Sequence, residues 1–245
     1  MSLSNPTMND IVKKHYLYKL RSHRTILISL ILIQILGILL SSFSGEYSAG
    51  YAFDNYIEVN FSIFSNSIII MLTLLWAFAA SIHLTNKAHR YEIFTFVTNR
   101  ITNQISNILL LLTLSLIGGT TAITAGFTTR LIIYYKYSSN ALASSFLEYM
   151  TGIIAVFLYI LLISSLGYLI GTLVQFHKSF ILIIPSLYVG IITFGSLKIG
   201  SWLELLYRSI VEEPILLLFA FKVLLLVFIF FAISIGIQNR LEVRR

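Results

Sequence analysis

The chain has 245 residues, of which 57% are hydrophobic and only 11% are charged, and it contains no cysteine. So apolar a composition argues against a soluble domain and is typical of a membrane protein. The lack of cysteine excludes disulfides, a thiolate nucleophile and cysteine-ligated metal or iron–sulfur sites. The net charge of +7 could suggest nucleic acid, but the distribution of the charges along the chain indicates membrane orientation instead.

Six long apolar stretches fill most of the chain. A helix of about 20 apolar residues crosses a hydrocarbon core of about 30 Å, and lipid offers no partners to backbone N–H and C=O groups left unpaired. We therefore expect an all-α membrane protein with a single transmembrane domain over residues 1–245. The predicted spans lie at about residues 25–43, 60–84, 105–127, 150–174, 180–197 and 214–237.

The basic residues separate by side under this six-span arrangement. Twelve of the 17 Lys and Arg residues fall on the side of the N-terminus, and four fall on the other side. An excess of Lys and Arg in short loops marks the cytoplasmic face, so both termini are predicted to be cytoplasmic. We expect a multi-pass protein of the cell membrane, and the composition is compatible with a low-GC bacterium.

The segment before the first span, residues 1–24, is basic. Between Met8 and Arg24, lysines and arginines alternate with Ile11, Leu17 and Tyr18, which predicts a cytoplasmic interfacial helix in contact with membrane lipid. A solvated basic tail is the alternative interpretation. Cleavage as a signal peptide is disfavoured, because the basic part is too long and five further spans follow.

The loop between the second and third spans combines charges with aromatic residues. As a short helix it would carry an apolar ridge with charged flanks beyond the membrane, and such a ridge suits the groove of a cytosolic partner. We expect the two phenylalanines to be anchors and the charged residues to form a polar rim; an interfacial turn lying against lipid is the alternative. The predicted docking residues are Arg90, Tyr91, Glu92, Phe94, Phe96 and Arg100.

Because of this loop and the order of the predicted spans, the chain resembles the permease subunits of type-2 ABC exporters. That family has an interfacial N-terminal helix, six spans and a coupling helix between spans two and three, which here corresponds to Glu92 to Arg100. Thr98 stands where the family often has proline. The run from Leu166 to Thr172 is also family-like, although its Gly167 and Gly171 form a GxxxG spacing that any packed membrane helix might contain. The resemblance covers nearly the whole chain through span order and loop lengths.

The resemblance implies a half-transporter that works as a dimer with a second permease subunit, identical or related. Two cytosolic ABC ATPases would bind ATP and Mg²⁺ and drive export of an amphiphilic substrate, such as a peptide antibiotic, a drug or a lipid-like molecule. The chain itself is not expected to be an enzyme or to hold a cofactor. It has no GxxxxGK[ST] motif: the run from Gly195 to Gly200 has the glycine spacing, but Ser201 stands where the lysine must be.

The resemblance also implies a re-entrant outer helix between spans five and six. The candidate outer-gate residues are Trp202, Leu206 and Tyr207, and an ordinary amphipathic helix on the outer leaflet is the alternative. Three polar residues within spans are candidates to line a path: Gln34, His83 and Lys222. The alternatives are helix-packing hydrogen bonds for the first two, and snorkelling or a structural ion pair for Lys222.

Two other classes of protein stay open. Glu212 and Glu213 are similar to the paired glutamates of intramembrane metallo-peptidases, but Leu217 stands where that family has arginine, and three of the histidines fall on the opposite side. A secondary transporter is disfavoured because no carboxylate lies at the centre of a span. A structural or regulatory membrane protein is the remaining alternative.

Overall fold

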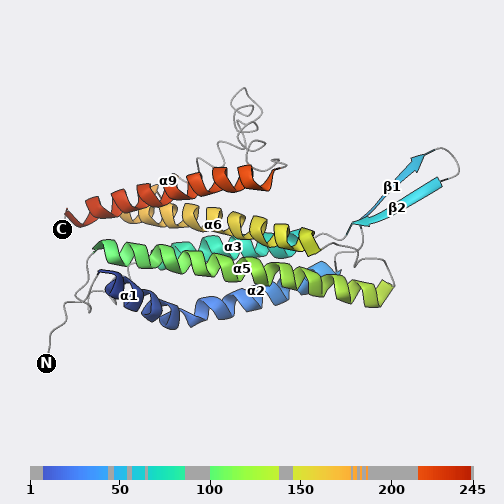
Figure 1. The fold of residues 1–245 in the computed structure, drawn as a ribbon, viewed down its shortest axis with the longest axis horizontal. Helices are drawn as coiled ribbons and strands as arrows, with labels where there is room; N and C mark the ends of the chain where they lie inside the picture. The colour runs from blue at the N-terminus through green and yellow to red at the C-terminus, as the bar shows by residue number, and fades with distance from the viewer. Residues whose placement is uncertain are drawn as a thin grey trace, which may run out of the picture.

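The protein is an elongated bundle of helices in a computed structural model (Figure 1). The structure describes residues 8–43, 47–53, 57–63, 66–85, 100–137, 146–177, 179–180, 183, 186 and 215–243. The helices are α1 (Met8–Ser22), α2 (Arg24–Phe43), α3 (Ser67–Leu84), α5 (Arg100–Tyr137), α6 (Phe146–Phe176) and α9 (Leu216–Val243). Two strands, β1 (Tyr47–Phe53) and β2 (Ile57–Ile63), form an antiparallel pair.

Five of these helices are long and apolar enough to cross a membrane. The candidate spans are Arg24–Ser42, Ser67–Leu84, Ile101–Ile132, Tyr149–Phe176 and Leu216–Gln238. They correspond to the first, second, third, fourth and sixth predicted spans, so these five are confirmed as helices that are long and apolar enough to cross a membrane. The predicted fifth span, residues 180–197, lies outside the described residues except for Phe180, Ile183 and Ser186.

The start of the second predicted span is wrong. Residues 60–63 belong to β2, and α3 begins only at Ser67. The reason can be read in the chain: from Ile57 to Ile63, apolar residues alternate with Glu58, Asn60 and Ser62, and a period of two favours a strand over a helix. The β1–β2 hairpin projects beyond the helices at the end of the bundle far from α1 (Figure 1).

The neighbours α6 and α9 run in the same direction. The rings of Tyr159 and Phe219 lie 4.9 Å apart between centroids, and those of Tyr168 and Phe231 lie 6.0 Å apart, so residue numbers rise together along both helices. In Figure 1 α6 ends at the α1 end of the bundle, whereas α9 begins nearer the other end and also finishes at the α1 end, on the far side of α5 and α6 from α1. The end of α6 and the start of α9 therefore lie toward opposite ends of the bundle.

The GxxxG pair brings α6 against α3. A Cβ added to Gly167 would lie 2.1 Å from the Ser81 hydroxyl, and one added to Gly171 would lie 2.1 Å from the Thr85 hydroxyl. Both partner residues are buried. Only glycine allows this approach, so the helix-packing interpretation of the motif is confirmed.

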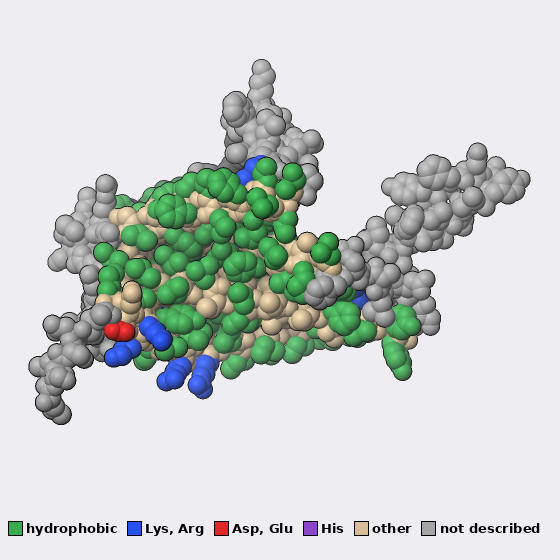
Figure 2. All heavy atoms as spheres, in the orientation of Figure 1, with side chains coloured by type: hydrophobic (Ala, Val, Ile, Leu, Met, Phe, Trp, Pro, Cys, Tyr) green, Lys and Arg blue, Asp and Glu red, His purple; other side chains and the backbone are tan. Residues whose placement is uncertain are grey.

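The best-buried apolar side chains come mainly from α3, α5 and α6, whereas α2 and α9 expose long apolar faces. Figure 2 shows the described surface covered largely by hydrophobic side chains, with Lys and Arg gathered around α1. In a bilayer an apolar outer surface of this kind contacts lipid rather than water.

Candidate functional site

The first helix, α1, packs its side chains at one end of the bundle, beside the start of α5. Its buried residues are Val12, His15 and Lys19, whereas Lys13 and Lys14 are exposed. The spacing of three to four residues between the buried positions places them on one helical face, and the intervening lysines fall on the other. Lys19 is thereby separated from the other cations of α1 and turned toward α5.

Lys19 is only 4% exposed, and its ammonium group is surrounded by oxygen atoms of α5. Its Nζ donates to the Asn103 carbonyl oxygen at 3.1 Å, to Asn103 Oδ1 at 2.5 Å, to Ser106 Oγ at 2.7 Å and to Asn107 Oδ1 at 2.5 Å. All four acceptors are uncharged and lie on two successive turns of one helix. Lys19 therefore fastens α1 to the first turns of α5.

Two opposing influences act on the charge of Lys19. Burial lowers its pKa to about 7, because removal from water penalises the ammonium. The surrounding carbonyl, amide and hydroxyl oxygens favour the ammonium, since each accepts a hydrogen bond from it. The pKa of the neighbouring His15 is also lowered, first by burial and then by the charge of Lys19.

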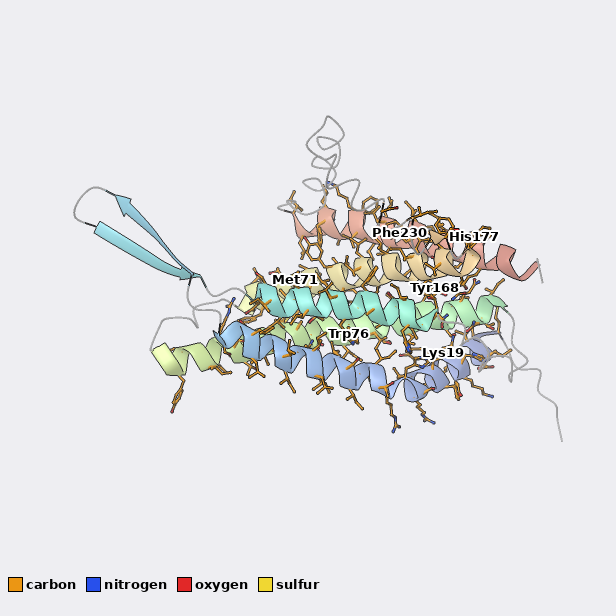
Figure 3. The ribbon with its side chains drawn as sticks, turned by 180° about the vertical axis from the view of Figure 1, so that it is seen from behind. Lys19, Met71, Trp76, Tyr168, His177 and Phe230 are labelled. Carbon is orange, nitrogen blue, oxygen red and sulfur yellow. The ribbon has the colours of Figure 1, made fainter. Side chains whose placement is uncertain are left out.

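The polar contacts continue from α5 to two further helices. Asn107 accepts from Lys19 through Oδ1 and donates through Nδ2 to the Tyr168 hydroxyl of α6 at 3.3 Å. Gln238 of α9 donates to the same hydroxyl at 3.2 Å. Tyr168 is fully buried, and Figure 3 labels it and Lys19 in the half of the bundle near α1.

We call this set the polar seam; it joins α1, α5, α6 and α9 and consists of Lys19, Asn103, Ser106, Asn107, Tyr168 and Gln238. Next to it on α5, Gln104 is 3% exposed, and its Oε1 has no hydrogen-bond partner among the described residues. An unsatisfied buried acceptor costs about 1–3 kcal/mol. This end of the bundle thus holds one buried acceptor that no described residue satisfies, beside the polar seam.

The three candidate path residues lie at different depths on three helices. Gln34 of α2 is buried and donates through Nε2 to Thr121 Oγ1 of α5 at 2.9 Å, which is a helix-packing hydrogen bond. His83 is exposed near the end of α3, and Lys222 is partly exposed in the second turn of α9. The structure does not bring the three together into one site.

The other predicted site residues fall largely outside the described part of the chain. This applies to the docking residues Arg90, Tyr91, Glu92, Phe94 and Phe96, and to the outer-gate residues Trp202, Leu206 and Tyr207. Arg100 is the first residue of α5, and its side chain is not described. The structure does place the helices on both sides of the predicted docking residues: α3 ends and α5 begins at the α1 end of the bundle (Figure 1).

The polar seam was not predicted from the sequence, although a signal for it exists. Ser106 and Asn107 follow Asn103 by three and four residues, and all three stand at the start of an otherwise apolar helix. Polar residues on one face of a membrane helix usually meet a partner within the protein. The identity of that partner, a lysine 84 to 88 residues earlier, has no signal in the sequence.

The described residues contain no group of three or more His, Asp or Glu residues that could hold a metal ion. The paired glutamates Glu212 and Glu213 lie outside this part of the chain. In comparisons with known proteins, no family model, no curated protein and no solved structure matches the chain.

Proposed function

We propose that the chain is the permease subunit of an ATP-driven exporter that moves an amphiphilic substrate across the cell membrane by alternating access. The observation that carries this proposal is the polar seam. It ties α1, α6 and α9 to the first turns of α5, directly after the loop of residues 86–99. A displacement of that loop by a cytosolic ATPase would therefore reach four helices at once.

The joints of the seam differ in strength, which suggests how the bundle opens. Lys19 holds α5 through hydrogen bonds from a charged group, and these contribute about 1.5–3 kcal/mol each. Tyr168 is held through neutral hydrogen bonds at 3.2 and 3.3 Å, which contribute about 0.5–1.5 kcal/mol each. We expect α1 and α5 to move as one unit and the contact with Tyr168 to break first.

The directions of the helices support a six-span permease. Since α6 and α9 run parallel, a single further crossing between them, at the predicted fifth span of residues 180–197, would complete six spans. Both termini would then lie on the same side, and the excess of basic residues there makes that side cytoplasmic. A second permease subunit would complete the transport path, and ATP and Mg²⁺ would be bound by the partner ATPases.

The test is recovery of an ATPase with the tagged, full-length chain from its native membrane. Wild type should retain a cytosolic ATPase, identified by mass spectrometry and by ATP hydrolysis, and Phe94→Ala/Arg100→Ala should lose it. The matched control is Tyr135→Ala, which also truncates an aromatic residue. Tyr135 is 92% exposed and lies near the far end of α5.

Each outcome bears on the proposal. Loss of the ATPase from the double variant alone would establish both the exporter function and the docking loop. If folded wild type carries no ATPase, the proposal fails, and the metallo-peptidase and structural interpretations take its place. If Tyr135→Ala loses the ATPase as well, docking at residues 90–100 is refuted.

A further inference from the structure

The cations of α1 are divided between two opposite faces. Lys19 points into the bundle, whereas Lys13, Lys14 and Arg21 are exposed, as is Arg24 at the start of α2. With 3.6 residues per turn, the three exposed cations of α1 fall within an arc of about 100°. The outer face of α1 is thus basic, with Asp10 as the one acidic residue in the helix.

Apolar side chains accompany these cations. Leu17 is 41% exposed and Tyr18 is 45% exposed, and both lie between Lys14 and Arg21 along the helix. A face that combines Lys and Arg with partly exposed Leu and Tyr matches the boundary between headgroups and acyl chains, because long basic side chains extend to the phosphates while the apolar ones stay below.

The position of α1 next to the ends of two candidate spans fits a location at the membrane surface. The helix ends at Ser22, and the first candidate span begins at Arg24. The partners of Lys19 on α5, Ser106 and Asn107, belong to the first two turns of another candidate span, Ile101–Ile132. Figure 2 shows Lys and Arg side chains gathered around α1 beside a surface that is mostly hydrophobic.

We propose that the outer face of α1 binds the headgroups of anionic phospholipids, with Lys13, Lys14, Arg21 and Arg24 contacting phosphates. Lys19 fixes the orientation of α1 by holding its opposite face against α5. The exposed cations therefore face the membrane before any headgroup binds. This preorganisation removes the ordering cost that a basic tail would meet on binding. The inference does not depend on the transport function.

The absence of native cysteine allows a local measurement. A single cysteine introduced as Ser22→Cys carries a fluorophore, and the labelled protein is reconstituted in vesicles with a spin-labelled quencher lipid, either phosphatidylglycerol or phosphatidylcholine. Ser22 is exposed, and its replacement keeps every residue of the proposed surface. The control label is Leu39→Cys, at an exposed apolar position near the other end of α2.

At position 22 the anionic quencher should reach half-maximal quenching at a mole fraction at least about fivefold lower than the zwitterionic one, the effect expected of one cation near an anionic surface. Replacement of all four cations by Gln should abolish this difference, and 1 M salt should reduce it strongly, because the screening length falls to about 3 Å. Lys13→Arg/Lys14→Arg, which retains the charge, should keep it. At position 39 the two quenchers should act alike.

Two results would overturn the inference. Equal quenching by both lipids at position 22 would show that the face does not select anionic headgroups. Selectivity that survives the four Gln substitutions would assign it to other residues.

Discussion

Replacing Gly167 by alanine should push α6 away from α3. The new Cβ would lie 2.1 Å from Ser81 Oγ and 2.9 Å from the carbonyl oxygen of Phe78. The hydroxyl could rotate away at the loss of its 2.8 Å hydrogen bond to that carbonyl, but the carbonyl belongs to the helix backbone and cannot. The helices must therefore separate to accommodate the methyl group.

The expected loss of unfolding free energy is about 1–3 kcal/mol, the usual cost of overpacking a closely packed site. Alanine forms helix better than glycine by up to about 1 kcal/mol, which offsets part of this loss. Gly236→Ala isolates the propensity effect, because a Cβ at Gly236 meets nothing within 4 Å. That variant should be as stable as wild type or slightly more stable.

Compensating substitutions make the test sharper. At Gly171 the close atoms all belong to the Thr85 side chain, with Oγ1 at 2.1 Å, Cβ at 3.0 Å and Cγ2 at 3.1 Å. Thr85→Ala removes two of the three atoms, so it should largely restore the stability of Gly171→Ala. Ser81→Ala should restore Gly167→Ala only in part, because the Phe78 carbonyl remains.

The assay is reversible unfolding in mixed micelles, followed as the free energy of unfolding for each single and double variant. Interaction energies then come from the two double-mutant cycles. If Gly167→Ala proves as stable as Gly236→Ala, the close approach of α3 and α6 is refuted. If the two compensating alanines restore equally, the assignment of the backbone carbonyl as the rigid obstacle is wrong.

Three other substitutions test the polar contacts. Lys19→Met should lower the unfolding free energy by no less than about 1.5 kcal/mol, the low end for one hydrogen bond from a charged group, since all the oxygens of α5 lose their donor. Because burial lowers the Lys19 pKa from 10.5 to about 7, the unfolded chain binds more protons between these values, and wild-type stability should rise with pH across that interval. Lys19→Met should lack this rise, and identical pH profiles for the two proteins would contradict it. Tyr168→Phe leaves two amide donors without their acceptor, so a thermal melt should show a loss of about 1–3 kcal/mol, and an unchanged melt would remove Tyr168 from the seam. Gln34→Leu breaks one hydrogen bond to Thr121 and should cost only about 0.6 kcal/mol in the unfolding assay; a transport defect at near-normal stability would assign Gln34 to the path instead.

The helical spans were predictable because they follow from a local property. An apolar run of sufficient length must form a helix in lipid, whatever the rest of the chain does, and five predicted spans coincide with helices. The error at residues 60–63 has the same local origin. The apolar content of this segment suits a span, but the alternation from Ile57 to Ile63 is also a local signal, and it distinguishes a strand from a helix.

The sequence alone thus determined the membrane class, the helical architecture and the separation of charges, because each depends on residues close together in the chain. Tertiary structure decided which polar residues meet. Lys19 is one of several similar cations in the sequence, and only its contact with α5, more than 80 residues away, turns it into a buried structural group. Likewise, Gly167 and Gly171 matter because Ser81 and Thr85 lie against them. Such contacts depend on how separate helices are placed in space, and hydrophobic periodicity within one helix does not encode that placement.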